Sequence, residues 1–360
     1  MAAPLQTAGK GHIWKIAIRY ILGIAIGVVV LLLLFGKRGE LLGAWHQLGH
    51  VRVTWVAAAV VAEALSTTAY AILQHRVLRL SGSGARLSSL SVITLGNNAI
   101  ANSVPGQPAV SSAYRYRHYR RLGASGASAG WTVFTVVIAQ ALGMSLLLLL
   151  GVAIALVASS GSKDTGIAVV GLLVVAAGAG LLIRRDLLLR FAALLVRACQ
   201  RVTGRPRTGM GARIEATLAR MREIPLAARS SVGIVAIGAS VWAFDFACLL
   251  CAFAAVRAHI PWQGVLLAYG VAQVVGSLPI VPGGIGVVEG SLAVVLVAYG
   301  TARVAALSAT LVYRIISFWL AIAVGWVCIG VIAHRARREE EPVVQLPAPG
   351  LQPVGALPPE

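Results

Sequence analysis

Four ionisable side chains lie inside apolar stretches that are long enough to cross a membrane: Glu63, Asp245, Glu289 and Arg314. A charged group at the centre of a bilayer costs about 2.5–3.5 kcal/mol on insertion scales, so each is expected to face a partner or a wet cavity. Two interpretations are open. The four groups could form buried ion pairs between helices, for instance Arg314 with Glu289 or Asp245. They could also line a polar path for a lipid headgroup or a proton.

A proline- and glycine-rich stretch, PIVPGGIGVVEG at residues 279–290, interrupts the apolar segment Val265–Tyr299. Pro279 and Pro282 cannot continue the preceding helix, and the glycines that follow allow the backbone to turn. Irregular backbone at membrane depth is tolerated only where protein or a water-filled cavity covers it. The stretch therefore predicts a broken helix, which is typical of a transport site.

The turn in this stretch opens a second helical arm, with Glu289 expected one to two turns into it. Free amide groups at the start of a helix form an anion site, here suited to a lipid phosphate, and the residues expected to provide it are Gly283, Gly284 and Gly286. The alternative is that the glycines only permit the turn and Glu289 offsets the helix dipole.

A second break, at Pro105-Gly106, divides the segment Leu87–Leu122, and an arginine-rich arm follows it. Arginine forks bind phosphate bidentately, so Arg115 and Arg117 are candidates for collecting anionic headgroups. A basic anchor at the membrane surface is the alternative. Several amides in the apolar runs are expected either to bond across helices or to line a permeation path: Asn97, Asn98, Asn102, Gln140 and Gln273.

The composition indicates the elements that must position these groups. The chain is 58% hydrophobic and 12% charged, with a mean hydropathy of +0.83, which excludes an ordinary soluble domain and predicts an all-α polytopic membrane protein. The net charge is +19. The basic residues lie at the membrane flanks, where they are expected to bind anionic lipid, and nucleic acid is not an expected partner. Six full spans are expected, at Ile16–Phe35, Val53–Ile72, Gly130–Val157, Thr165–Ile183, Val232–Val256 and Val304–Ala333.

The positive-inside rule sets the expected topology. If the first broken segment is a hairpin that enters and leaves on one side, most lysines and arginines fall on one side of the membrane,. The second segment would then be a hairpin that opens from the outside, although two complete short spans there would place the charges on the same sides. This arrangement places both termini in the cytoplasm and the protein in the cytoplasmic membrane. No signal peptide is expected, because the first apolar run is too long for one.

Pro105-Gly106 and Pro282-Gly283 are 177 positions apart, and at the same offset Gly123 matches Gly300. This predicts an inverted repeat, a transporter architecture. The expected organisation is a cytoplasmic N-terminal segment at 1–15 and a membrane domain at 16–336. Within that domain we expect repeat 1 at about 53–157, a connector span at 165–183, a basic cytoplasmic loop at 184–229 and repeat 2 at about 230–333. A disordered cytoplasmic tail is expected at 337–360.

Catalytic and metal-binding patterns find little support. His46 and His50 have helical spacing but lack a nearby acidic partner except Glu40, and Cys248 and Cys251 fall within a predicted span,. A phosphate-binding P-loop motif is absent from the sequence,. We therefore expect no metal, no cofactor and no enzymatic activity.

The sequence resembles the transmembrane-domain family of lysylphosphatidylglycerol synthases over about Ile16 to Ala333. The resemblance is carried by PGGIGVVE from Pro282 to Glu289, by Gly300 and Arg314, and by a weaker first-repeat motif that includes Asn102 and Arg115. This family tends to carry an acidic residue in the first motif where this chain has Ser112. The resemblance implies the flippase half of the multiple peptide resistance factor, without the soluble aminoacyl-transfer domain.

The expected function is therefore a flippase or transporter of a phosphate-bearing lipid or lipid-linked substrate. The alternative is a non-catalytic membrane subunit that presents lipid to a separate glycosyl- or aminoacyl-transferase. Anionic membrane lipids are the expected partners, with a separate transferase and homo-oligomer formation as further candidates.

Overall fold

The computed structural model describes residue 49, residues 51–103, 107–159, 228–277 and 282–340. The described residues are helical, with short turns and no strand. Four helices are long and apolar enough to cross a membrane: Val53–Leu80, Gly126–Ala155, Ser230–Ala255 and Arg303–Val331. They coincide with four of the predicted spans; the other two, Ile16–Phe35 and Thr165–Ile183, lie outside the described residues. The described part of the chain is all-helical, and the chain is a multi-pass membrane protein.

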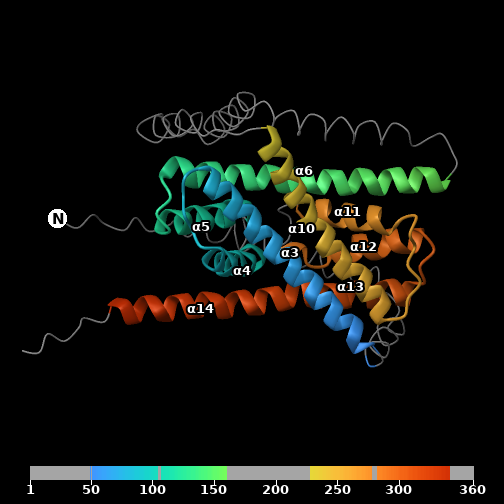
Figure 1. Ribbon diagram of the computed structural model, residues 1–360. Coiled ribbons are helices and arrows are strands. Elements are labelled where there is room, and N and C mark those ends of the chain that lie inside the picture. Colours follow the sequence, from blue (N-terminus) through green and yellow to red (C-terminus); the bar gives the residue numbers. More distant parts are fainter. Residues whose placement is uncertain (1–48, 50, 104–106, 160–227, 278–281, 341–360) are drawn as a thin grey trace, which may run out of the picture.

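Two antiparallel helices form the centre of the molecule, α3 (Val53–Leu80) and α10 (Ala228–Ala255). They run diagonally side by side (Figure 1), and the Arg52 amide donates to the Ala255 carbonyl oxygen at 3.0 Å where their ends meet. The helix α6 (Gly126–Ser159) flanks this pair on one side. On the other side lie α13 (Arg303–Arg314) and α14 (Ala321–Glu340).

Each predicted broken segment forms two shorter helices. The first comprises α4 (Leu87–Ser103) and α5 (Gln107–Arg121), and its break at Pro105 and Gly106 lies outside the described residues. The second comprises α11 (Val265–Gly276), a short 3-10 turn at Pro282–Gly284, and α12 (Val287–Ala298). Pro279 also lies outside the described residues.

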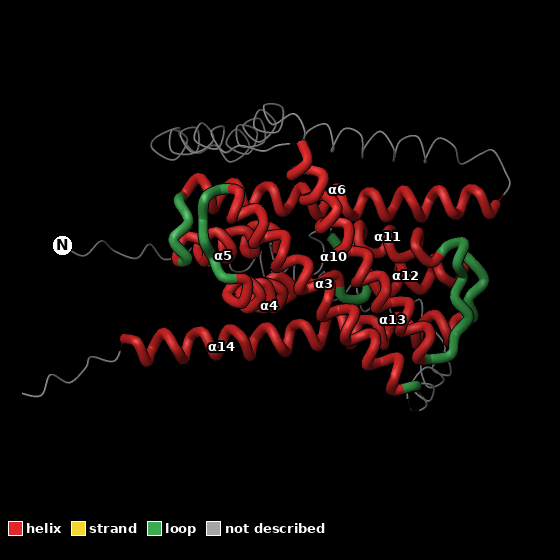
Figure 2. The backbone as a smooth tube through the Cα atoms, viewed as in Figure 1, coloured by secondary structure: helices red, strands yellow, loops and turns green. Residues whose placement is uncertain are grey.

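The two helical hairpins enter from opposite ends of the molecule. The loops that join them to the long helices are at one end for α4 and α5 and at the other end for α11 and α12 (Figure 2). They approach each other in the middle: a methyl group added to Gly283 would lie 3.0 Å from the carbonyl oxygen of Asn102. The C-terminal end of α4 therefore lies beside the second break.

Small residues allow close helix packing, as is usual between membrane helices. A methyl group added to Gly143 of α6 would lie 2.6 Å from the backbone of Gly238 in α10. One added to Gly325 of α14 would lie 2.3 Å from the carbonyl oxygen of Leu95 in α4. Large apolar side chains such as Val61 and Val327 point outward and are exposed, where lipid would cover them,.

The C-terminal part of the chain differs from the sequence expectations in two ways. The last span is not one regular helix, because a π-helical segment, Ile315–Leu320, joins α13 to α14. In addition, α14 continues to Glu340, so residues 337–340 are helical although the expected disordered tail begins at 337.

Candidate functional site

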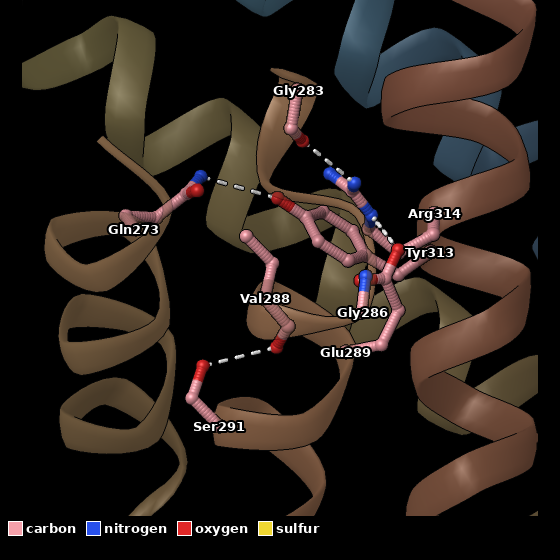
Figure 3. A network of polar contacts seen from close by, with 8 residues as sticks. All are labelled: Gln273, Gly283, Gly286, Val288, Glu289, Ser291, Tyr313 and Arg314. Atoms are coloured by element: carbon pink, nitrogen blue, oxygen red, sulfur yellow. Dashed lines mark hydrogen bonds and ion pairs between the residues drawn. The ribbon is translucent and has the colours of Figure 1, made fainter. Parts of the chain in front are cut away.

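The second helix break is closed by a buried ion pair (Figure 3). Arg314 Nε donates to Glu289 Oε1 at 2.6 Å, and Arg314 Nη2 donates to the carbonyl oxygen of Gly283 at 3.1 Å. The amide of Gly286 donates to Glu289 Oε2 at 2.7 Å. Both carboxylate oxygens are thus occupied, and the pair ties the last span to both sides of the break. The predicted pairing of Arg314 with Glu289 is present.

Glu289 is the third residue of α12, so it lies in the first turn of the helix and not one to two turns into it. From that position its carboxylate reaches back to the helix N-terminus, where it offsets the helix dipole. Of the three glycines predicted to hold an anion, Gly286 binds Glu289 through its amide and Gly283 offers its carbonyl to Arg314, while Gly284 is buried against Val288. An internal carboxylate therefore occupies part of the predicted anion site.

The π-helical segment after Arg314 places Phe318 against the same break. The guanidinium of Arg314 lies over the Phe318 ring, 4.0 Å from its centroid, and a methyl group on Gly283 would be 2.4 Å from that ring. Stacking on an aromatic face favours a buried guanidinium. A π-helical insertion in a span is often found at functional positions.

A second polar group surrounds Asp245 in α10, which is buried. Its Oδ2 accepts hydrogen bonds from Tyr313 Oη at 2.8 Å, from Gln273 Nε2 at 2.8 Å and from the hydroxyl of Tyr269. Glu63 of α3 lies within interaction distance of Asp245. Of the four predicted membrane-depth charges, the structure thus brings together two pairs, Glu63 with Asp245 and Glu289 with Arg314.

A polar cavity of about 430 Å³ opens between α3, α4, α5, α6 and α10. Glu63 lines it, together with side chains that could hydrogen-bond a polar ligand: Tyr70, Asn97, Asn98, Asn102 and Gln140. Membrane-spanning proteins place such groups toward a cavity or pathway because lipid cannot hydrogen-bond them. Asn102 also lies beside the second break, because a methyl group added to Gly283 would be 3.0 Å from its carbonyl oxygen.

Arg115 of α5 is only 4% exposed and lies behind the wall of this cavity. Its Nη1 donates to the hydroxyl of Tyr70, and its Nε donates to the carbonyl oxygen of Ser111 at 3.5 Å; both partners line the cavity. Within the described residues, Arg115 forms no ion pair with a carboxylate. Ser111 in turn donates to Asn97 Oδ1 at 2.8 Å, which fixes α4 against α5.

Arg117, the other predicted headgroup ligand, is exposed and does not join this cavity. It lines two surface grooves on either side of α5, of about 570 and 510 Å³. One groove is mainly apolar and runs along Val133 and Val137 of α6. The other includes His118 and Arg121. Arg115 and Arg117 therefore occupy different environments.

Several polar contacts could not be assigned from the sequence. Tyr269 and Tyr313 provide two of the three donors to Asp245, and Tyr70 holds Arg115. The only sequence signal for the Asp245 group was the spacing of Tyr269 and Gln273, which puts both on one face of α11,.

Comparison with known proteins gives two matches. The family described as "Lysylphosphatidylglycerol synthase TM region" matches residues 20–325. A "UPF0104 membrane protein" from Methanothermobacter thermautotrophicus is 34% identical over 97 residues, which cover 27% of this chain and 29% of that protein. The chain thus aligns with less than a third of the length of this relative.

Proposed function

The chain belongs to the lysylphosphatidylglycerol synthase TM region family, and from this premise we propose that it moves a phosphate-bearing lipid or lipid-linked substrate across the cytoplasmic membrane. The observation that carries the proposal is the polar cavity between α3, α4, α5, α6 and α10, with the buried Arg115 beside it. The family name refers to a synthase, but the proposal concerns translocation alone.

The chemistry of the cavity fits a headgroup that carries phosphate. A buried guanidinium without a carboxylate partner is costly, and an entering phosphate would supply the missing charge. Arg115 has five N–H donors, and the contacts to Tyr70 and Ser111 use only part of them,. The amides of Asn97, Asn98 and Asn102 would bond the remaining polar atoms of the headgroup. Acyl chains would stay in the lipid outside.

The exposed basic side chains of α5 could guide an anionic lipid toward the cavity. Arg117, His118 and Arg121 line a groove on the outer face of α5, and the lining of that groove contains no acidic residue. A cationic groove with apolar walls suits an anionic headgroup with its chain. Ala113, on the same helix, lines both grooves that flank it. Arg117 would collect lipids that Arg115 then binds.

An inverted repeat with two re-entrant hairpins is part of the proposal. The offset of 177 that relates the two breaks also relates α3 to α10, α4 to α11, α5 to α12, and α6 to α13–α14, to within a few residues at their starts. Gly123 and Gly300 end their helices with φ of 87° and 90°. The next amide donates to the carbonyl five residues earlier in both cases, from Ala124 to Tyr119 and from Thr301 to Leu296.

Packing between the two halves is reciprocal, which supports the same interpretation. The first arm of one hairpin, α4, packs on α14 of the other half, and α11 packs on α6 of the first half. Glycines allow both contacts: Gly325 faces the backbone of Leu95, and Gly151 faces the backbone of Leu267. Each repeat thus packs the first helix of its hairpin against a long helix of the other repeat. Such an arrangement is suited to alternating access around a fixed site.

The proposal is tested by translocation of a fluorescent phosphatidylglycerol in reconstituted vesicles, with a membrane-impermeant quencher added outside. We expect the purified protein to expose label from the inner leaflet faster than protein-free vesicles do. Arg115→Gln should slow this by about tenfold or more, since a hydrogen bond to a charged group contributes about 1.5–3 kcal/mol. Arg86→Gln, at an exposed arginine in the loop between α3 and α4, is the matched control and should retain the wild-type rate.

Equal rates in wild-type and protein-free vesicles would contradict translocation. If the protein then still bound the labelled lipid, presentation of lipid to a separate transferase would replace the proposal.

A further inference from the structure

Two carboxyl groups meet in the centre of the molecule. Asp245 accepts three hydrogen bonds on one oxygen, from Tyr269, Gln273 and Tyr313. All three donors converge on Oδ2 of Asp245, so this carboxyl group is well supported by hydrogen bonds,.

Glu63, which lies beside it, has no comparable support. Its Oε2 is fully buried and has no hydrogen-bond partner among the described residues. Within that part of the chain, neither Glu63 nor Asp245 forms an ion pair with a basic side chain. The other titratable groups that face the pair are Cys248 of α10 and the two tyrosine hydroxyls from α11 and α13. Each of these is neutral or, if ionised, negative.

Two adjacent carboxylates repel each other strongly where water is scarce, because the local dielectric constant is low. A proton on Glu63 removes this repulsion. It also turns the carboxyl group into a donor, which gives the otherwise unpaired oxygen a hydrogen bond to Asp245.

We propose that Glu63 and Asp245 form a proton-binding site that couples headgroup movement to a proton. This inference rests on the proposed function. Glu63 lines the polar cavity, so its proton can pass to water there: the O–H bond of Glu63 breaks, a hydrated proton leaves through the cavity, and the charge of the pair changes from −1 to −2. An anionic headgroup in the cavity opposes this release by repulsion. Headgroup and proton therefore bind together and move in the same direction, and each raises the affinity of the other.

A pH gradient across reconstituted vesicles tests the coupling. With one proton moved per lipid, a gradient of one pH unit should shift the steady-state distribution of fluorescent phosphatidylglycerol between the leaflets by about tenfold. Glu63→Gln keeps a neutral donor of similar shape and should abolish the shift. Thr68→Ala, at an exposed position on the same helix, is the matched control and should respond as the wild type does.

An infrared spectrum of the purified protein gives an independent measurement. We expect the carbonyl stretch of a protonated carboxylic acid near neutral pH in the wild type, and its loss in Glu63→Gln. If the leaflet distribution of the lipid does not change with the pH gradient, or changes with a sodium gradient instead, the inference is overturned while the proposed function stands. A wild type that translocates no lipid would overturn both, and the infrared band would then show only whether the pair binds a proton.

Discussion

Arg314 Nε lies 2.6 Å from Glu289 Oε1 across the second helix break, and this pair is buried. Arg314 comes from the last span and Glu289 from the first turn of α12, so the contact joins two elements that the chain separates by a loop at the far end of the molecule. The same guanidinium holds the carbonyl of Gly283. The ion pair therefore fixes the shape of the tip of the second hairpin.

Removal of one partner of this pair should strongly destabilise the protein. Glu289→Gln leaves a buried guanidinium without its counter-charge, and Arg314→Met leaves a buried carboxylate; each should cost about 3–5 kcal/mol. The double variant should lose clearly less than the sum, because no uncompensated charge remains. Denaturation of all four proteins in detergent measures this. Additive losses would show that the two side chains do not interact.

The tip should not tolerate a side chain at Gly283. Its φ is 63°, a conformation that costs an L-residue about 1–2 kcal/mol,, and a methyl group would be 2.4 Å from Phe318. We expect Gly283→Ala to lower the unfolding free energy by roughly 2–5 kcal/mol when strain and overpacking are combined.

Gly330→Ala in α14 is the matched control for this substitution. Its added methyl group has open space within 4 Å, and alanine is favoured over glycine in a helix by about 0.5–1 kcal/mol. The control should be neutral or slightly stabilising. A Gly283→Ala protein as stable as this control would contradict the tight tip.

The sequence predicted the helical class and the broken helices well, because both depend on local chemistry. Apolar runs of membrane length define the long helices, and proline with glycine ends α11 and opens α12. The pairing of Arg314 with Glu289 could also be anticipated, since a membrane-depth charge needs a partner.

The cavity could not be located from the sequence. Its walls come from five helices, and which face of α6 or α10 points inward depends on packing at Gly143 and Gly238. The hydrophobic pattern gives little help, because helices surrounded by lipid and protein are apolar on all sides. For the same reason the roles of Tyr70 and Tyr313 could not be predicted. The π-helical segment after Arg314 was not predicted either, because no local residue pattern indicates it.

The topology makes a further prediction. In a variant without native cysteines, Ser88→Cys at the start of α4 should react with an impermeant thiol reagent only from the cytoplasmic side. Gln263→Cys, before α11, should react only from the outside. Both positions are exposed, and the loops that precede α4 and α11 lie at opposite ends of the molecule (Figure 2). The positive-inside rule assigns the sides, since the arginines near Ser88 far outnumber those near Gln263,. Labelling of both from one side would exclude oppositely oriented hairpins.

The most direct test of the account is whether lipid passes through the cavity, measured as the initial translocation rate of fluorescent phosphatidylglycerol after the cavity is filled. Asn98→Trp places a large side chain among the cavity residues, while Val327→Trp adds the same side chain at a position of α14 that is 67% exposed. We predict that Asn98→Trp reduces the rate to that of protein-free vesicles and that Val327→Trp retains the wild-type rate. A folded Asn98→Trp protein that translocates lipid as fast as the wild type would contradict the account.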